Sequence, residues 1–236
     1  MTAREQILGE VKRALRREGK PEPARGETVP IASSHLEDVV SRIRENCDRR
    51  REELIEQFEA ESRRIGIHFH RAADSDSVFQ YIEQLSSARE AKRIIAWETE
   101  VITDLGLQGR FEERGVEFLN ETAPEFIRKA EAADIGVSGV DYGVADTGTL
   151  VLLARKGQAR SISLLPPVHV ALIKPEQIVS GLSDLFPLLR AEAHAEARDL
   201  SSAITLITGP SRTADIELTL VVGVHGPQQL HVLLLE

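Results

Sequence analysis

The chain has 236 residues, of which 42% are hydrophobic and 28% charged, and its formal net charge at pH 7 is -9. This composition suits one α/β domain with an appendage better than two full domains. The negative charge, together with the lack of a long basic run, argues against a nucleic-acid partner, because phosphate binding needs a basic face.

Cysteine and apolar content set the expected compartment and cofactors. Cys47 is the single cysteine, so the chain can form no intramolecular disulfide and is not expected to hold an iron–sulfur cluster, which takes about four protein ligands. The first residues lack the apolar core of a signal peptide, and no apolar stretch approaches the ~20 residues of a membrane helix. We therefore expect a cytoplasmic protein with no membrane span and no metal or cofactor of its own.

Residues 1–64 are predicted to form an N-terminal helical extension. Apolar residues recur at helical spacing over 3–18, and prolines and glycines then make 19–32 a linker. A capping-box pattern near Ser34 opens a second helical repeat, which predicts one long helix to about Arg64. Cys47 falls on the apolar stripe of this helix, which favours a buried structural thiol over a reactive one.

Residues 65–236 are predicted to form an α/β domain. Its first half alternates strands at 66–70, 92–97, 115–119 and 134–138 with helices at 75–88, 99–108 and 123–132. That alternation predicts parallel strands joined by right-handed crossovers.

The second half of the domain breaks this alternation. Two apolar runs, Leu150–Ala154 and Ile162–Leu165, predict a hairpin. The remaining expected elements are a strand at Val168–Ile173, a helical stretch at 175–199 interrupted near Pro187, and strands at 203–208, 216–222 and 230–235. The fold class is therefore α/β with a mixed, mostly parallel sheet.

Several familiar catalytic signatures are missing from the sequence. There is no Gly-x-Gly-x-x-Gly turn, no phosphate-binding loop and no His-Glu-x-x-His zinc helix. The segment Gly136–Gly139, with Ser138 inside it, falls short of a hydrolase nucleophile elbow because Val140 stands where a glycine is needed. His68 and His70 would share a strand face without a third ligand, so ordinary surface roles are favoured over a metal site.

Polar, glycine-containing turns lie next to three predicted strands of the second half. They are 143–149, 208–215 and 223–227. Their hydroxyls, backbone amides and single arginine suit a small anionic ligand. For each turn alone, hydroxyls that cap the local backbone are the simpler alternative, but turns that converge at a sheet edge form ligand sites in α/β proteins. We therefore expect the three turns to line one shared pocket.

Four segments resemble the LUD domain of the lactate utilisation protein C family. They are Ala145–Thr149, Leu164–His169, Thr208–Glu217 and Gly223–Pro227, and the likeness is strongest over residues 134–236. The resemblance implies a fold similar to that of sugar-phosphate isomerases and coenzyme A transferases. It also implies a part in the oxidation of L-lactate to pyruvate, together with two cysteine-rich partner proteins that hold iron–sulfur clusters.

Three functions are compatible with this resemblance. The favoured one is a non-redox subunit in which Arg212, Arg160 or His225 holds a carboxylate, while a neutral histidine takes a hydroxyl proton. The main alternative is a stand-alone enzyme acting on a sugar phosphate or an acyl-coenzyme A, with Asp146 or Glu217 as the carboxylate nucleophile. The third is a purely structural partner of the iron–sulfur proteins.

The candidate catalytic residues are Asp146 and His225. Family members often have Glu at the position of Asp146, so the carboxylate of this chain is one methylene shorter than theirs. Arg212 is the expected main anion contact, because it is the only strong cation among the three turns. The complete set of ligand-binding candidates is Thr147, Gly148, Thr149, Arg160, Gly209, Ser211, Arg212, Thr213 and Gly226.

Overall fold

The computed structural model describes residues 33–196, 201–214 and 220–236. The chain divides into two compact units, residues 1–38 and 39–236. The helix expected at 3–18 and the linker at 19–32 lie outside the described residues. Everything that follows on sheets, cavities and contacts concerns the second unit.

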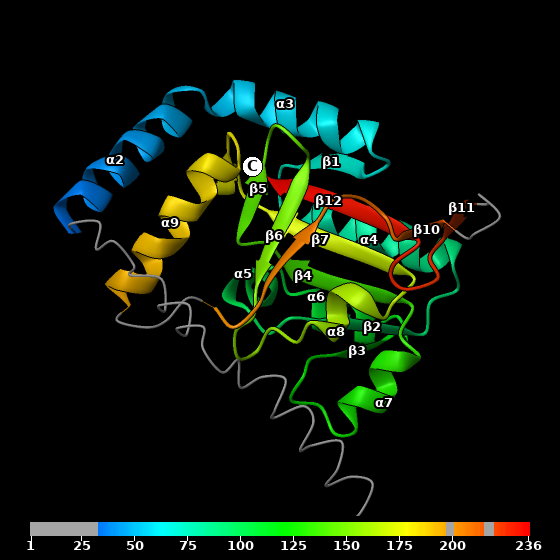
Figure 1. Ribbon diagram of the computed structural model, residues 1–236. Coiled ribbons are helices and arrows are strands. Elements are labelled where there is room, and N and C mark those ends of the chain that lie inside the picture. The colour runs from blue at the N-terminus through cyan, green and yellow to red at the C-terminus, as the bar shows by residue number, and fades with distance from the viewer. Residues whose placement is uncertain (1–32, 197–200, 215–219) are drawn as a thin grey trace, which may run out of the picture. The chain divides into compact units, whose positions relative to one another are not determined.

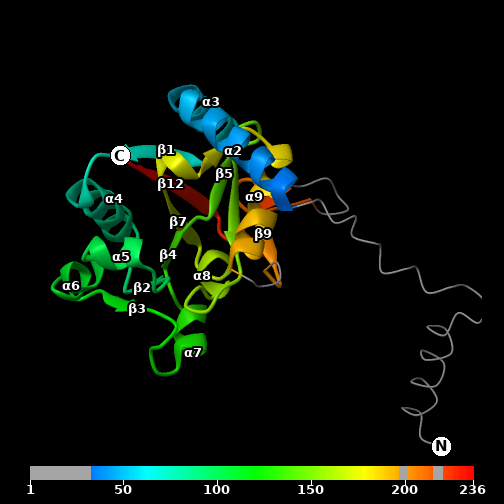
Figure 2. The same ribbon diagram turned by 90° about the vertical axis from the view of Figure 1, so that its left-hand side faces the viewer.

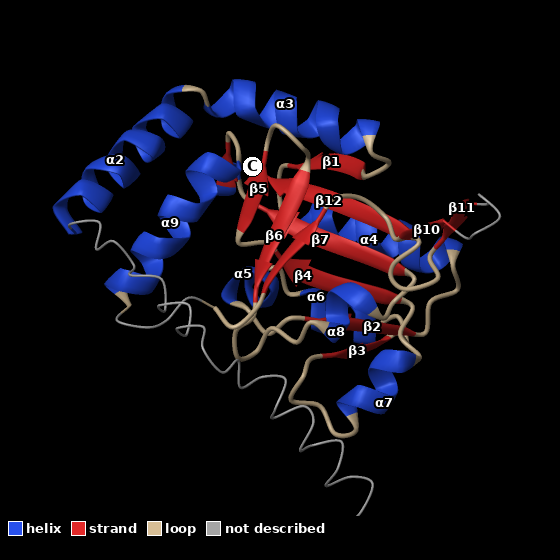
Figure 3. Cartoon of the chain, viewed as in Figure 1, coloured by secondary structure: helices blue, strands red, loops and turns tan. Residues whose placement is uncertain are grey.

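A six-stranded sheet forms the centre of this unit (Figures 1 and 3). In spatial order its strands are β1 (His68–Ala72), β12 (Gln229–Leu235), β7 (Val168–Ile173), β4 (Ile135–Gly139), β2 (Arg93–Ala96) and β3 (Glu117–Leu119). Every pairing in this sheet is parallel, as the strand–helix alternation predicted. All six residues of β7 are buried, which fits a central strand covered on both faces.

Helices cover one face of this sheet and a second sheet lies toward the other. Figure 2 shows α4, α5 and α6 on one side of the six strands, with β5, β9 and α8 on the opposite side. The bounds of these helices are α4 (Ser75–Ala88), α5 (Glu100–Asp104), α6 (Leu107–Glu112) and α8 (Ser161–Leu164). The buried side chains of α4 recur three or four residues apart, which is why this segment is helical and packs with one face inward.

The antiparallel pairs of the fold form sheets of their own. The four-stranded sheet contains, in spatial order, β8 (Ile178–Val179), β5 (Tyr142–Val144), β6 (Thr149–Leu153) and β9 (Ile204–Ile207). A two-stranded ribbon of β10 (Arg212–Ala214) and β11 (Leu220–Val222) is also antiparallel. The mixed α/β character of the chain is thus confirmed, and its antiparallel part lies in the second half, separate from the parallel sheet.

The long helix expected to end near Arg64 is two helices, α2 (Ser33–Arg49) and α3 (Arg51–Arg64). Arg50 interrupts the helical geometry with φ -106° and ψ 17°. The amide of Arg50 still donates to the carbonyl of Asn46, and its own carbonyl accepts from Leu54, so the interruption is a kink rather than a loop. The apolar side of α3 is buried and packs on β1 and β8.

Three other expectations differ from the structure in their local conformation. The apolar run Ile162–Leu165 is not the second arm of a hairpin: Ser161–Leu164 is the short helix α8, and β6 pairs with the distant β9 instead. An apolar run of this length does not distinguish strand from helix by periodicity.

The helical stretch expected from 175 begins only at α9 (Leu182–Ala195), after a 3-10 turn and β8, and it continues through Pro187. The expected helix at 123–132 is the shorter α7 (Phe126–Glu131).

Candidate functional site

A cavity of about 220 Å³ lies between the start of β7, the loop after β9 and the loop before β12. We call it the histidine cavity. Its lining residues are Ser163, Leu164, His169, Thr205, Leu206, Ile207, Thr208, Gly209, Pro210, Ser211, His225, Gly226, Pro227 and Leu230. Three of the four segments that carry the family resemblance contribute to this lining directly. The second and third polar turns therefore meet, as the sequence led us to expect.

Backbone hydrogen bonds fix the two turns against each other. The amide of Ser211 donates to the carbonyl of Pro227 over 2.9 Å, and the amide of Gly223 donates to the carbonyl of Ser211 over 2.9 Å. Side-chain packing is equally close, since a Cβ at Gly226 would lie 3.2 Å from Cβ of Ser211. Gln228 then donates to the carbonyl of Pro167 over 2.8 Å, which attaches both turns to the start of β7.

The first polar turn reaches the cavity through a chain of hydroxyls. Oγ1 of Thr147 lies 2.8 Å from Oγ1 of Thr149, which lies 2.8 Å from Oγ1 of Thr208 in the cavity wall. Thr149 is buried and Thr147 is half-buried. Each hydroxyl can donate one hydrogen bond and accept others, so the chain can present Thr208 to the cavity either as a donor or as an acceptor.

His169 and Ser163 are the buried polar residues among those that line the cavity. Nε2 of His169 lies 2.8 Å from Oγ of Ser138 on the neighbouring strand β4, and both side chains are 0% exposed. Burial lowers the pKa of His169 to about 3, with a smaller contribution from His231. The imidazole is therefore neutral at pH 7. Its Nδ1 has no hydrogen-bond partner within the described part of the chain.

The pair of Ser138 and His169 has the spacing of a nucleophile and its general base, but not the surroundings. A working serine nucleophile needs access to substrate and a base whose second nitrogen is held by a carboxylate. Here the serine is fully buried, and Nδ1 of the histidine is unpaired. We conclude that the serine fixes the buried imidazole in place, which agrees with the incomplete nucleophile elbow in the sequence.

Arg212, expected to be the main anion contact, has a local partner. Its Nη2 donates to the carbonyl of Ile65 over 2.8 Å, and the side chain is exposed and does not line the histidine cavity. The contact is close enough that a Cβ at Gly66 would lie 2.8 Å from the same nitrogen. Arg212 thus attaches the start of β10 to the end of α3.

Four further candidates from the sequence lie outside the cavity lining. Gly148 packs against the backbone of α3, and Asp146 is exposed beside Gly181, where a Cβ would lie 2.9 Å from its Oδ2. Arg160 is exposed at the start of α8, and Thr213 pairs with Val221 in the β10–β11 ribbon. Glu217 lies outside the described residues.

Sequence reasoning did not single out His169, Ser138 or Thr208 as site residues. The sequence feature that could have indicated His169 is its position inside the continuous apolar run Val168–Ile173. A polar residue in such a run is either paired or functional, because burying it unpaired costs free energy. Its partner Ser138 lies 31 positions away, and no local pattern connects them.

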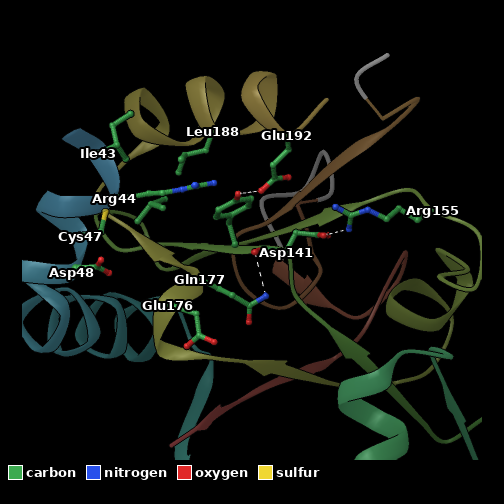
Figure 4. A pocket seen from close by; sticks show the side chains of 12 residues that line it. Ile43, Arg44, Cys47, Asp48, Asp141, Arg155, Glu176, Gln177, Leu188 and Glu192 are labelled. Carbon is green, nitrogen blue, oxygen red and sulfur yellow. Dashed lines mark hydrogen bonds and ion pairs between the residues drawn. The ribbon is translucent and has the colours of Figure 1, made fainter. Parts of the chain in front are cut away.

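A second cavity, of about 290 Å³, lies among α2, α9 and β5 (Figure 4). The hydroxyl of Tyr142 donates to Glu192 across it, and Arg155 pairs with Asp141 at its edge. Burial, followed by the Glu192 contact, raises the pKa of Tyr142. Figure 4 shows Arg44 reaching over this cavity toward Glu192. We call it the tyrosine cavity.

Most polar groups of the tyrosine cavity already have partners in the chain. Nε2 of Gln177 donates to the carbonyl of Val140, and its Oε1 accepts from the amide of Lys174. Cys47, at the α2 wall, is buried as predicted, and desolvation raises the pKa of its thiol. This cavity is therefore a less favourable ligand site than the histidine cavity, which is lined by three of the four segments that carry the family resemblance.

The described residues contain neither a metal-binding cluster nor a membrane-spanning helix. They contain no group of three or more His, Cys, Asp or Glu side chains placed to hold a metal ion. No helix in residues 33–196, 201–214 or 220–236 combines the length and apolar character needed to cross a membrane.

Comparison with known proteins gives a consistent family relationship. The LUD domain profile matches residues 55–235, a range that contains every residue lining the histidine cavity. A protein of Halalkalibacterium halodurans named lactate utilization protein C is 39% identical over 64% of this chain and 66% of its own length. A protein of the same name from Shouchella clausii is 34% identical over 76% of this chain and 78% of its own.

One solved structure shares the fold. It is the crystal structure of a DUF162 family protein from Deinococcus radiodurans, with a TM-score of 0.54 and 22% sequence identity. The match covers 79% of this chain and 98% of that protein.

Proposed function

Because the chain belongs to the LUD domain family, we propose that it acts in lactate utilisation, as a non-redox subunit of a system that oxidises L-lactate to pyruvate. The observation that carries this proposal is the similarity to proteins named lactate utilization protein C, at 39% and 34% identity. In this function the histidine cavity is the site at which the subunit meets a small ligand.

Electron transfer in this system would belong to iron–sulfur partner proteins. The single cysteine supports this division of labour, since a cluster takes about four ligands, mostly cysteines. Oxidation of lactate releases two electrons, which the side chains around the histidine cavity have no means of storing. The proposal therefore requires a partner that accepts them.

The alternative of a stand-alone coenzyme A transferase has less support. Such an enzyme needs a carboxylate nucleophile next to its substrate. The residues that line the histidine cavity include no Asp or Glu, and Asp146 lies instead beside Gly181. Fold similarity alone carries little weight for chemistry, because one fold hosts many reactions.

Growth of a deletion strain tests the proposed function. In a strain without any other lactate dehydrogenase, deleting the gene should abolish growth on L-lactate and leave growth on pyruvate normal. A plasmid copy of the full chain should restore it. Equal growth of the deletion strain on both carbon sources contradicts the proposal.

Purification from the native host tests the partners. The tagged chain should co-purify with iron-containing proteins, and the complex should oxidise L-lactate with an artificial electron acceptor. Removing this chain should abolish that activity, and adding it back should restore it. If the partners oxidise lactate at the same rate without it, the chain is not a working subunit of the system.

A complementation test separates a ligand-binding subunit from a purely structural one. The variant His169→Phe removes the imidazole from the cavity wall while keeping a planar ring of similar size. If this variant folds and co-purifies with the partners but fails to restore growth on L-lactate, the cavity is used. If it restores growth fully, the chain has only a structural function.

A further inference from the structure

The tyrosine cavity lies within the second unit and has an apolar side. This side is formed by Ile43 and Cys47 on α2, Val179 on β8 and Leu188 on α9. Cys47, Val179 and Leu188 are buried, so their positions are fixed by packing. The volume of about 290 Å³ suits a small molecule. The cavity thus offers an apolar surface on which a short aliphatic chain can pack.

Paired side chains form the fixed part of the polar wall. The hydroxyl of Tyr142 donates to Glu192. Burial, followed by this contact, raises the pKa of Tyr142, so the hydroxyl keeps the proton that holds Glu192. Arg155 pairs with Asp141, and Oδ2 of Asp141 also accepts from the amide of Leu153 over 2.6 Å. These groups have their hydrogen bonds without any ligand.

Two charged side chains of the cavity wall, Arg44 and Glu176, lack such a partner. Neither has a hydrogen bond or an ion pair to any residue that the structure describes. Asp48, a further acid of the lining, is paired with Arg51. Figure 4 shows Arg44 on one side of the cavity and Glu176 on the other. Both side chains are exposed, so a ligand that enters from solvent can reach them.

The opposite charges of these two side chains select a ligand that carries both charges itself. Arg44 can donate two parallel hydrogen bonds to a carboxylate, and Glu176 can accept from an ammonium group. A ligand with only a carboxylate would leave Glu176 unpaired, and it would also meet the negative charge of Glu192 in the same wall. A ligand with only an amino group would leave Arg44 unpaired. A zwitterion satisfies both side chains at once.

We propose that the tyrosine cavity binds an aliphatic amino acid as a zwitterion, with its carboxylate at Arg44, its ammonium group at Glu176 and its carbon chain on the apolar side. Among the described residues, none lines both this cavity and the histidine cavity. Binding here is therefore independent of the proposed function, and neither result decides the other.

Isothermal titration calorimetry of the full chain tests the zwitterion. The amino acids are L-leucine and its isomer ε-aminocaproate, which carry the same two charged groups at different separations. Two analogues of leucine each lack one charge: isoamylamine has no carboxylate, and isocaproate has no amino group. At least one amino acid should bind about ten- to a hundredfold more tightly than either analogue, the effect of a charge-assisted hydrogen bond. The isomer that binds more tightly gives the separation of the two charges in the site.

Two outcomes of this titration overturn the proposal. One is the absence of saturable binding of both amino acids up to about 10 mM. The other is an analogue that binds as tightly as the better amino acid, because one of the two charged side chains then contributes nothing.

Variants that remove one charge assign the two ends of the ligand. Arg44→Gln should remove the advantage of the amino acid over isoamylamine, and Glu176→Gln its advantage over isocaproate. Because both side chains are exposed and unpaired, both variants should fold as the parent does, which circular dichroism checks. Parent affinity for the amino acid in either variant contradicts the assignment.

Two control variants test the location of the site. Arg49→Gln removes a charge from the same helix α2 outside the cavity lining, and it should bind the amino acid as the parent does. Thr208→Val changes the wall of the histidine cavity and should also leave the affinity unchanged. Loss of binding in Thr208→Val would place the ligand in the histidine cavity and refute this inference.

Discussion

Oγ of Ser138 lies 2.8 Å from Nε2 of His169. The two residues belong to the neighbouring parallel strands β4 and β7, and both side chains are fully buried. The two residues are polar positions in strands whose other inward side chains are largely apolar. Because their contact satisfies one nitrogen of a buried imidazole, the stability of the protein should depend on both side chains.

Replacing Ser138 with alanine should destabilise the protein. The change leaves both nitrogens of a buried imidazole without a partner, which costs about 1–3 kcal/mol. Ser62→Ala is the matched control, because Oγ of Ser62 is buried and already unpaired, so its removal from α3 should be neutral or stabilising. Urea unfolding of both variants measures the difference. Equal effects of the two substitutions would show that the Ser138 contact contributes nothing.

Acidification should destabilise the chain through two buried histidines. Burial is the main cause that lowers the pKa of His169 to about 3 and that of His231 to about 4, from an ordinary value of 6.5. Between pH 6.5 and 4 the unfolded chain therefore binds more protons than the folded one. The free energy of unfolding should fall by ~1.4 kcal/mol per pH unit for each histidine across this window.

Urea unfolding between pH 7.5 and 4.5 checks this slope. His231→Gln should reduce it by about half, because one of the two titrating groups is then missing. The hydroxyl of Tyr81, which lies 2.9 Å from Nδ1 of His231, can still bond to the amide. A stability that stays flat down to pH 4.5 contradicts both lowered pKa values.

Gly148 should not tolerate a side chain. Its φ of +65° is unfavourable for other residues, and a Cβ would lie 2.7 Å from the backbone nitrogen of Ser62. Gly106→Ala is the control, since Gly106 has a similar φ of +60° but open space around a Cβ. Gly106→Ala should cost about 1–2 kcal/mol from backbone strain alone, and Gly148→Ala distinctly more. Similar melting temperatures for the two variants would exclude the steric contact with α3.

Arg212→Ala should change stability rather than ligand binding. The substitution removes a hydrogen bond to the carbonyl of Ile65, which contributes about 1 kcal/mol. In the deletion strain the variant should restore growth on L-lactate as well as the parent does, because the side chain does not line the histidine cavity. A folded variant that fails to restore growth would instead support the anion-binding function that the sequence suggested for this arginine.

The purified chain should contain no iron. One cysteine cannot supply the thiolates of a conventional cluster. Iron and acid-labile sulfide assays of protein isolated without its partners should both give values far below one atom per chain. Stoichiometric iron and sulfide that survive gel filtration would contradict this prediction and the non-redox assignment with it.

The sequence alone determined the elements whose evidence is local. Helix α4 and strand β7 begin and end at the predicted residues, since periodic burial and flanking turn residues report directly on each segment. The parallel sheet was predicted from the order of those segments, because alternating strands and helices are typical of a parallel sheet with helical crossovers. The polar turns at 208–215 and 223–227 were visible for the same reason, as glycine and hydroxyl clusters beside apolar strands.

The tertiary structure decided which of these residues meet. Ser138 and His169 are 31 positions apart, Thr149 and Thr208 are 59 apart, and Arg212 and Ile65 are 147 apart. An apolar pattern in the sequence indicates that a side chain faces inward, but not which strand lies next to it. The sequence therefore could not show whether His169 is paired within the protein or contacts a ligand. It also could not show that Arg212 has a carbonyl to bind within the chain. Those partners exist only once β7 has been placed beside β4, and β9 beside β6, by packing over the whole domain.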